Sequence, residues 1–164
     1  MRLFFPLLLA LGLAACGFHL RGTASVPFQT LYIPNAKAGI ALDLKRNIEA
    51  GTNAKVVDDA KAADAILELS GEAREKIILS LTGTGRVREF RLRYTVGFRV
   101  HDGKGAQYVP PSTVQLTRDV TYNDAEILAK EAEEQLLFRD MQTDMVQQIL
   151  RRLAAAEKPK PKVE

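Results

Sequence analysis

The chain has 164 residues, of which 46% are hydrophobic, 26% charged and 7% aromatic, a composition typical of one soluble globular domain. Its 23 Lys and Arg residues against 20 Asp and Glu residues give a net charge of only +3, which by itself does not favour nucleic-acid binding. With one cysteine and two histidines, an internal disulfide framework is excluded and a closed Cys/His zinc site is disfavoured.

Residues 1–15 have the layout of a secretory signal peptide. Arg2 precedes an apolar run from Leu3 to Leu13, and the small residues Ala14 and Ala15 follow it. The run is too short for a membrane-spanning helix, which takes about 20 residues. The alternative, a buried N-terminal core helix, is disfavoured because the run has no polar face. We therefore predict export from the cytoplasm.

The sequence Leu13-Ala14-Ala15-Cys16 resembles the lipobox of bacterial lipoproteins. That resemblance implies cleavage before Cys16 and attachment of lipid to its thiol. The residue after the cysteine is Gly17 rather than an aspartate, which then indicates the outer membrane. Two acyl chains suffice for stable anchoring, and a triacylated cysteine would exceed that. The alternative is a free cysteine beside an ordinary cleavage site. No cofactor is expected beyond the covalent lipid.

The mature chain is predicted to consist of a lipidated tether over 16–27, one domain over 28–156 and a disordered Pro/Lys-rich tail over 157–164. Within the domain, 28–33 and 54–57 are predicted as short strands. Between them, apolar residues recur every fourth position from 38 to 50, which predicts an amphipathic helix.

Two long stretches of alternating apolar residues, 65–81 and 90–100, flank the sequence Thr82-Gly83-Thr84-Gly85. They predict a hairpin closed by a two-residue type II′ turn, with an irregularity near Gly71. Each arm would measure roughly 50 Å at about 3.3 Å per residue, so part of the hairpin is expected to project from the domain. The predicted register pairs Leu81 with Arg86, Ile77 with Phe90, Leu69 with Phe98 and Leu67 with Val100. The apolar residues of both stretches, Ile77, Leu79 and Leu81 included, would then share one face of the sheet and belong to the core under the helices.

A last strand is predicted over 113–122, after an edge or loop marked by Pro110 and Pro111. Asn123 and Asp124 are then expected to cap a helix that runs to about Ala156, with a core stripe from Leu137 to Leu153. The predicted fold is α+β: a two-layer sandwich whose mostly antiparallel four- to five-stranded sheet includes the long hairpin and carries both helices on one face.

No catalytic constellation is evident, since His19 and His101 lack a nucleophile signature nearby, and we predict that the protein is not an enzyme. The predicted register instead places Arg91 opposite Lys76 and Arg93 opposite Arg74. Like charges across a ladder are destabilising, so an anion or an acidic partner could neutralise them; the alternative is a solvated basic face. Arg86 and Arg88 add positive charge near the turn. This face lacks aromatic residues, which disfavours nucleic acid.

The opening Cys16-Gly17-Phe18-His19-Leu20-Arg21-Gly22, the segment Leu128-Ala129-Lys130 and the helix end Gln147–Leu153 resemble the LPS-assembly lipoprotein LptE family. The resemblance implies a sheet with two helices on one side. It also implies an outer-membrane lipoprotein, facing the periplasm and lying within the LptD β-barrel, which plugs and helps assemble that barrel and contacts lipopolysaccharide during its insertion into the outer leaflet.

In that family, basic residues near the hairpin tip and in the Leu-Ala-Lys segment are linked to lipopolysaccharide. The lysine carries over to Lys130, whereas the tip residue has no basic counterpart in the turn itself, so the nearest candidates are Arg86 and Arg88. The alternative functions are a stand-alone periplasmic lipid or glycolipid carrier, which would need a closed apolar cavity, and an envelope hydrolase, for which no nucleophile or metal set is evident.

Overall fold

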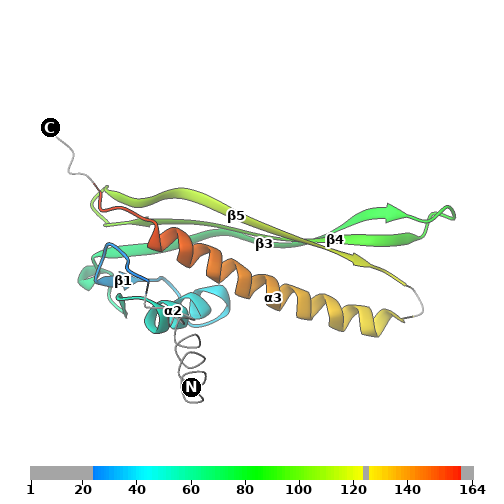
Figure 1. Ribbon diagram of the computed structural model, residues 1–164, viewed down its shortest axis with the longest axis horizontal. Coiled ribbons are helices and arrows are strands. Elements are labelled where there is room, and N and C mark those ends of the chain that lie inside the picture. The colour runs from blue at the N-terminus through cyan, green and yellow to red at the C-terminus, as the bar shows by residue number, and fades with distance from the viewer. Residues whose placement is uncertain (1–23, 124–125, 160–164) are drawn as a thin grey trace, which may run out of the picture.

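The computed structural model describes residues 24–123 and 126–159. Over these residues the chain forms a five-stranded sheet in the order β2-β1-β3-β4-β5, with both helices on one of its faces (Figure 1). The elements in chain order are β1 (Thr30–Tyr32), α2 (Gly39–Gly51), β2 (Lys55–Val57), a 3-10 turn η1 (Ala60–Ala62), β3 (Ala65–Leu81), β4 (Val87–His101), β5 (Gln107–Thr121) and α3 (Ile127–Ala154).

The predicted α+β two-layer fold is confirmed, but the sheet is mixed. β3, β4 and β5 are antiparallel neighbours, whereas β1 runs parallel to both β2 and β3. A parallel pair needs a crossover connection rather than a tight turn, and α2 supplies it between β1 and β2. The short N-terminal strands therefore add a parallel half to a sheet that is otherwise antiparallel.

The core lies between the sheet and the two helices. α2 buries Ile40, Leu44 and Ile48, the positions predicted from its four-residue periodicity. The alternating apolar residues of β4 from Leu92 to Val100 are buried on the same side of the sheet, so the helices cover the apolar face. The buried residues of α3 are Phe138, Met141, Met145, Val146, Ile149 and Leu153.

The predicted hairpin register is confirmed only near the domain. Leu67 pairs with Val100 and Leu69 with Phe98, but beyond Gly71 the register shifts by one residue, so that Ile77 lies opposite Arg91 instead of Phe90. Gly71 has φ +57, and an extra residue in one strand turns every later side chain to the other face. Before Gly71 the odd-numbered residues of β3 therefore face the helices, whereas from Ala73 to Ile78 the even-numbered residues do.

The register shift overturns the predicted pairs of like charge. Arg93 lies opposite Glu75 and Arg91 opposite Ile77, whereas Lys76 and Arg74 lie opposite Leu92 and Tyr94. The two sets of cations therefore occupy opposite faces of the sheet. The expectation that Ile77, Leu79 and Leu81 belong to the core is also wrong, since Leu79 and Leu81 are exposed.

The predicted two-residue type II′ turn is wrong as well. The Thr82 N–H donates to the Arg86 carbonyl at 2.7 Å and the Gly85 N–H donates to the Thr82 carbonyl at 2.9 Å. Gly85, rather than Gly83, has positive φ (+80). This pattern is a three-residue loop that ends in a left-handed glycine, and it places Leu81 opposite Val87 instead of Arg86.

The ends of the domain differ in part from the prediction. Of the segment 16–27, residues 24–27 are described and pack on the domain: the Val26 N–H donates to Asn53 Oδ1 at 2.8 Å and the Val26 side chain is buried. α3 begins at Ile127 with Glu126 at its N-cap and no side-chain cap bond, later than the expected cap at Asn123 and Asp124. The predicted signal peptide, Cys16 and residues 160–164 of the tail lie outside the described residues.

Candidate interaction surface

One face of the sheet is left uncovered by the helices, and we call it the open face. Since strand side chains alternate and Leu92, Tyr94 and Val96 are buried under the helices, Arg91, Arg93 and Arg99 point to the open face. On β5 the same alternation places polar residues on this face, where Asp119 lies opposite Arg91 and Thr117 opposite Arg93. These polar residues of β5 are Thr113, Gln115, Thr117, Asp119 and Thr121.

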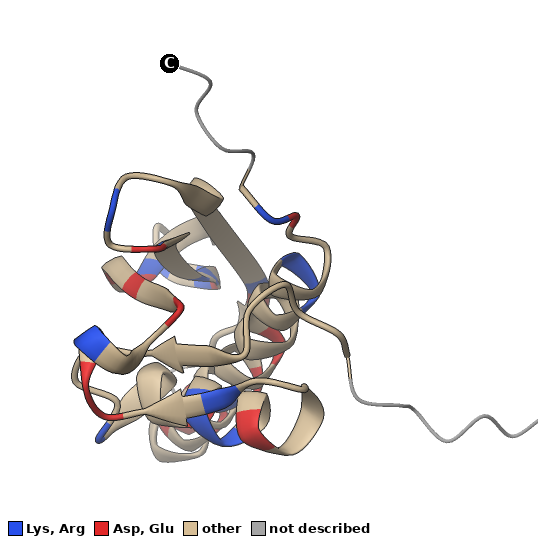
Figure 2. Ribbon diagram, turned by 90° about the vertical axis from the view of Figure 1, so that its left-hand side faces the viewer, with Lys and Arg blue, Asp and Glu red and all other residues tan. Residues whose placement is uncertain are grey.

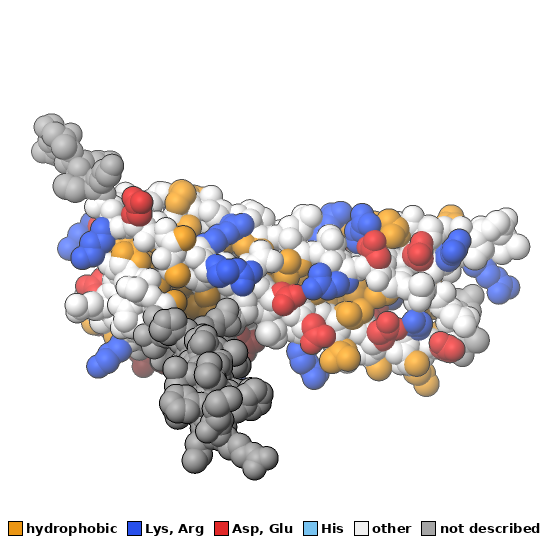
Figure 3. All heavy atoms as spheres, viewed as in Figure 1, with side chains coloured by type: hydrophobic (Ala, Val, Ile, Leu, Met, Phe, Trp, Pro, Cys, Tyr) orange, Lys and Arg blue, Asp and Glu red, His pale blue; other side chains and the backbone are white. Residues whose placement is uncertain are grey.

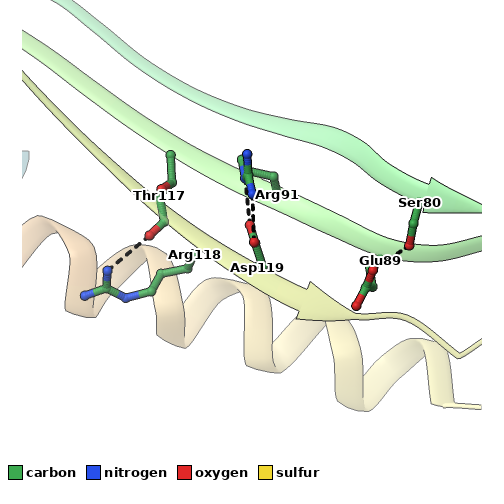
Figure 4. A network of polar contacts seen from close by, with 6 residues as sticks. All are labelled: Ser80, Glu89, Arg91, Thr117, Arg118 and Asp119. Carbon is green, nitrogen blue, oxygen red and sulfur yellow. Dashed lines mark hydrogen bonds and ion pairs between the residues drawn. The ribbon is translucent and has the colours of Figure 1, made fainter.

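Each arginine of the open face has a carboxylate partner. Arg91 binds Asp119 through two parallel hydrogen bonds of 2.7 and 2.8 Å (Figure 4), a bidentate geometry that lowers the pKa of Asp119. Arg99 Nε donates to Glu68 at 2.6 Å, and Arg93 lies 3.3 Å from Glu75. The arginines of the open face are therefore paired rather than free, and exposed pairs of this kind are individually weak.

Arg74 and Lys76 lie on the helix face, where they hold α3. Arg74 donates to Gln142 and its guanidinium lies 4.9 Å from the centre of the Tyr94 ring. Lys76 Nζ is 2.5 Å from Glu134 Oε2 and 4.4 Å from the centre of the Phe90 ring. Both cations are thus engaged by side chains of this chain, with cation–π contacts beside their polar bonds.

The remaining candidates lie at the end of the molecule that carries the hairpin tip. Arg86 and Arg88 are exposed beside the turn, and the side chain of Arg88 makes no ion pair or hydrogen bond with the residues the structure describes. Lys130 lies in the first turns of α3, which follows directly from the distal end of β5 (Figure 1), and pairs with Glu133 at 2.7 Å. The opposite end of the molecule carries interspersed charges of both signs (Figure 2).

Exposed large apolar side chains gather in the same distal half, a feature that the sequence reading missed. They lie among charged side chains on the surface in Figure 3, and they include Ile78, Leu79, Leu81, Ile127, Leu128 and Leu136. The signal was present in the sequence as the uncharged run Ile77–Leu81. Strict alternation, however, predicts that Ile77, Leu79 and Leu81 belong to the core.

The described residues hold no metal-ligand cluster of three or more His, Cys, Asp or Glu side chains. His101 accepts the Gly103 N–H at Nδ1 (3.0 Å), and its Nε2 lies 3.2 Å from Glu68 Oε1 without making a hydrogen bond to the described residues. His19 lies outside the described residues. No helix in the described part of the chain has the length and apolarity to cross a membrane.

Comparison with known proteins decides the family. The model of the lipopolysaccharide-assembly family LptE matches residues 25–153. The chain belongs to the LptE family. Among relatives named "LPS-assembly lipoprotein LptE", the protein of Photorhabdus laumondii is 29% identical over 153 residues, covering 90% of this chain and 83% of the relative. That of Pectobacterium atrosepticum is 30% identical over 156 residues, covering 91% and 84%.

Solved structures of lipoproteins agree with this LptE-family fold. The uncharacterized lipoprotein B of Nitrosomonas europaea is 46% identical with a TM-score of 0.73, covering 85% of this chain and 91% of that one. The rare lipoprotein B of Shewanella oneidensis is 28% identical with a TM-score of 0.66, covering 77% and 94%. The family description refers to assembly of lipopolysaccharide and not to a catalysed reaction.

Proposed function

We propose that this chain is an outer-membrane lipoprotein that plugs and helps assemble the LptD β-barrel and contacts lipopolysaccharide during its insertion into the outer leaflet. The observation that carries the proposal is the match to the LptE family over residues 25–153, which spans all elements from β1 to nearly the end of α3. The proposal includes a signal peptide over 1–15 and a lipid on Cys16, with no other cofactor.

The open face has the character that a plug inside a barrel requires. The lumen-facing side of a transmembrane β-barrel is polar. The open face offers hydroxyl and amide groups from β5 beside three paired arginines. Because these arginines already have carboxylate partners within the chain, a polar wall can enclose them without burying an unpaired cation, which would be costly.

The cations at the distal end are the stronger candidates for lipopolysaccharide, whose phosphates suit bidentate contacts by Arg and point contacts by Lys. Arg88 has the best case because its side chain is uncommitted within the described residues, and Arg86 and Lys130 lie at the same end. Arg91 and Arg93 would have to exchange a carboxylate for a phosphate. Arg74 and Lys76 have the weakest case because they hold α3.

The proposed partner can be tested by isolating the tagged chain from membranes. We expect LptD to co-purify at a fixed stoichiometry, and depletion of this chain to lower the amount of assembled LptD. A chain that is recovered alone, in cells whose LptD level does not change on depletion, would contradict the proposal.

The proposed ligand contact can be tested with Arg88→Glu. Since a hydrogen bond to a charged group contributes about 1.5 kcal/mol, we expect lipopolysaccharide binding to weaken roughly tenfold. The matched control is Arg46→Glu on α2, an exposed arginine at the other end of the molecule, which should bind normally. Equal binding by both variants would remove Arg88 from the site.

A further inference from the structure

Most of β3 forms an open edge of the sheet. β1 pairs only with its first two residues, Ala65 and Ile66, and β4 occupies its other side. From Leu67 to Leu81, no described strand pairs with the outer side of β3 (Figure 1). An unpaired edge presents a row of backbone donors and acceptors that can bind another strand.

The opposite edge of the same sheet, β5, is protected. Pro110 and Pro111 lie in its first half and supply no N–H groups. Two of its carbonyls also accept guanidinium donors: Thr113 from Arg152 at 3.2 Å, and Thr117 from Arg118 at 3.1 Å (Figure 4). Prolines and charged groups are the devices by which proteins prevent pairing at an edge.

The distal part of the β3 edge has neither prolines nor charged residues, and only its irregular pairing with β4 between Ile78 and Leu81 resembles such a device. Its residues from Ile77 to Leu81 include no charge and no proline, and Ile78, Leu79 and Leu81 are 55%, 41% and 55% exposed. The charged residues of β3 lie nearer the domain, from Glu68 to Lys76. A short segment of high β-propensity without charge, exposed at an edge, is the kind that pairs with another strand.

We propose that the chain, when it is not engaged by another protein, pairs with a second copy of itself through antiparallel contact of the two β3 edges over residues 75–81. A two-fold axis at Ile78 places Ile77 opposite Leu79, Lys76 opposite Ser80 and Glu75 opposite Leu81 of the second copy. Such an isologous contact closes on itself as a dimer, and it covers the exposed apolar run of both copies.

The charges of β3 favour this register over those nearer the domain. A two-fold axis at Arg74 or at Lys76 would place that cation opposite its own copy, and an axis at Glu75 would oppose two carboxylates; like charges directly opposite are destabilising. With the axis at Ile78, no like charges face each other over residues 72–81. The tip of one copy then ends beside Gly71–Arg74 of the other, short of the level at which β1 pairs with Ala65 and Ile66.

The pairing can be trapped by a disulfide in the full chain, produced in excess in cells so that free copies predominate. Opposed residues in an antiparallel pair have Cβ atoms about 4.5–5.5 Å apart, close to disulfide reach. Ile78→Cys should therefore give a species of twice the mass under mild oxidation. Thr117→Cys on the protected edge and the parent chain, which carries only Cys16, should not.

The register has its own test. Glu75→Cys and Leu81→Cys should cross-link when the two variants are co-expressed, and neither should when expressed alone. Adding Leu79→Lys to Ile78→Cys should lower the cross-linked fraction at least fivefold, whereas Leu136→Lys, at an exposed leucine of α3 (53%, against 41% for Leu79), should leave it unchanged.

Absence of the Ile78→Cys dimer, in membranes where the variant accumulates normally, would overturn the inference, as would cross-linking to a different protein instead of to a second copy. The test does not involve LptD or lipopolysaccharide, so its outcome is independent of the proposed function.

Discussion

Gly71 decides which face the side chains of β3 from Ala73 to Ile78 occupy. Its φ of +57 is a backbone conformation that costs other residues about 1–2 kcal/mol. On the neighbouring strand, Gly97 leaves room for the bulge. A Cβ at that position would lie 2.7 Å from Ser70 Oγ and 3.0 Å from the Ser70 carbonyl oxygen, which is too close. Two glycines thus allow the shift that sends Arg74 and Lys76 to α3.

We predict that Gly71→Ala lowers the free energy of unfolding by about 1–2 kcal/mol through backbone strain alone, since its Cβ would meet no atom within 4 Å. The measurement is chemical denaturation. Gly51→Ala, which has neither positive φ nor a close neighbour, should change stability by less than about 0.5 kcal/mol. Equal stability of the two variants would refute the role assigned to Gly71.

At the scale of the elements, α3 has two unlike halves. Every buried residue of the helix lies from Phe138 onward, so the C-terminal half is held by the core. The N-terminal half exposes Leu128 and Leu136 and is tied to the hairpin by polar contacts, chiefly that between Lys76 and Glu134. Lys76, a ligand-binding candidate by sequence, therefore holds the N-terminal half of α3 on the hairpin.

Lys76→Met should consequently loosen the first half of α3. The lost ion pair is partly buried and contributes about 1 kcal/mol or less, so we expect faster backbone amide exchange over residues 127–137 and little change over 141–153. Lys45→Met on α2, which removes the ion pair of Lys45 with Asp58, should leave α3 unaffected. Unchanged exchange at residues 127–137 would show that Lys76 does not hold the helix.

At the scale of the whole molecule, the buried core and the exposed candidate residues are separated along the long axis. The core lies between the helices and the end of the sheet that includes β1 and β2, and the hairpin of β3 and β4 extends from this end as an arm (Figure 1). The exposed apolar residues and the uncommitted cation Arg88 all belong to the distal half. Changes in the core should alter stability, whereas changes in the arm should alter binding.

Two substitutions on α3 measure this separation. Met145 is fully buried, so Met145→Ala should destabilise the protein by about 2–5 kcal/mol. Leu136 is 53% exposed, so Leu136→Ala should cost less than about 0.5 kcal/mol. Similar losses for the two variants in thermal unfolding would contradict a core confined to the proximal half.

Much of the fold was predictable because local periodicity carries it. The four-residue spacing of Ile40, Leu44 and Ile48 determines α2, and the alternation from Leu92 to Val100 determines the buried face of β4. The turn was not predictable, because Thr82-Gly83-Thr84-Gly85 offers two glycines and only the strand geometry selects Gly85 for the left-handed position.

The candidate surface was predictable only in part, because the face on which a strand residue lies depends on strand geometry as well as on local sequence. Which basic residues occur is a property of the sequence, but the faces of Arg74 and Lys76 depend on the bulge at Gly71 in β3. The family match confirms the resemblance carried by the segments near Cys16, Lys130 and Leu153, and it covers the described domain as a whole.

The amino-acid order alone determined the secondary structure, the two-layer architecture and the family, since each follows from patterns between residues close in the chain. The tertiary structure decided the partners of the cations, the parallel position of β1 and the open edge of β3. These depend on register and strand order, which are set by contacts between residues far apart in sequence, and one extra residue in a strand is enough to reverse them.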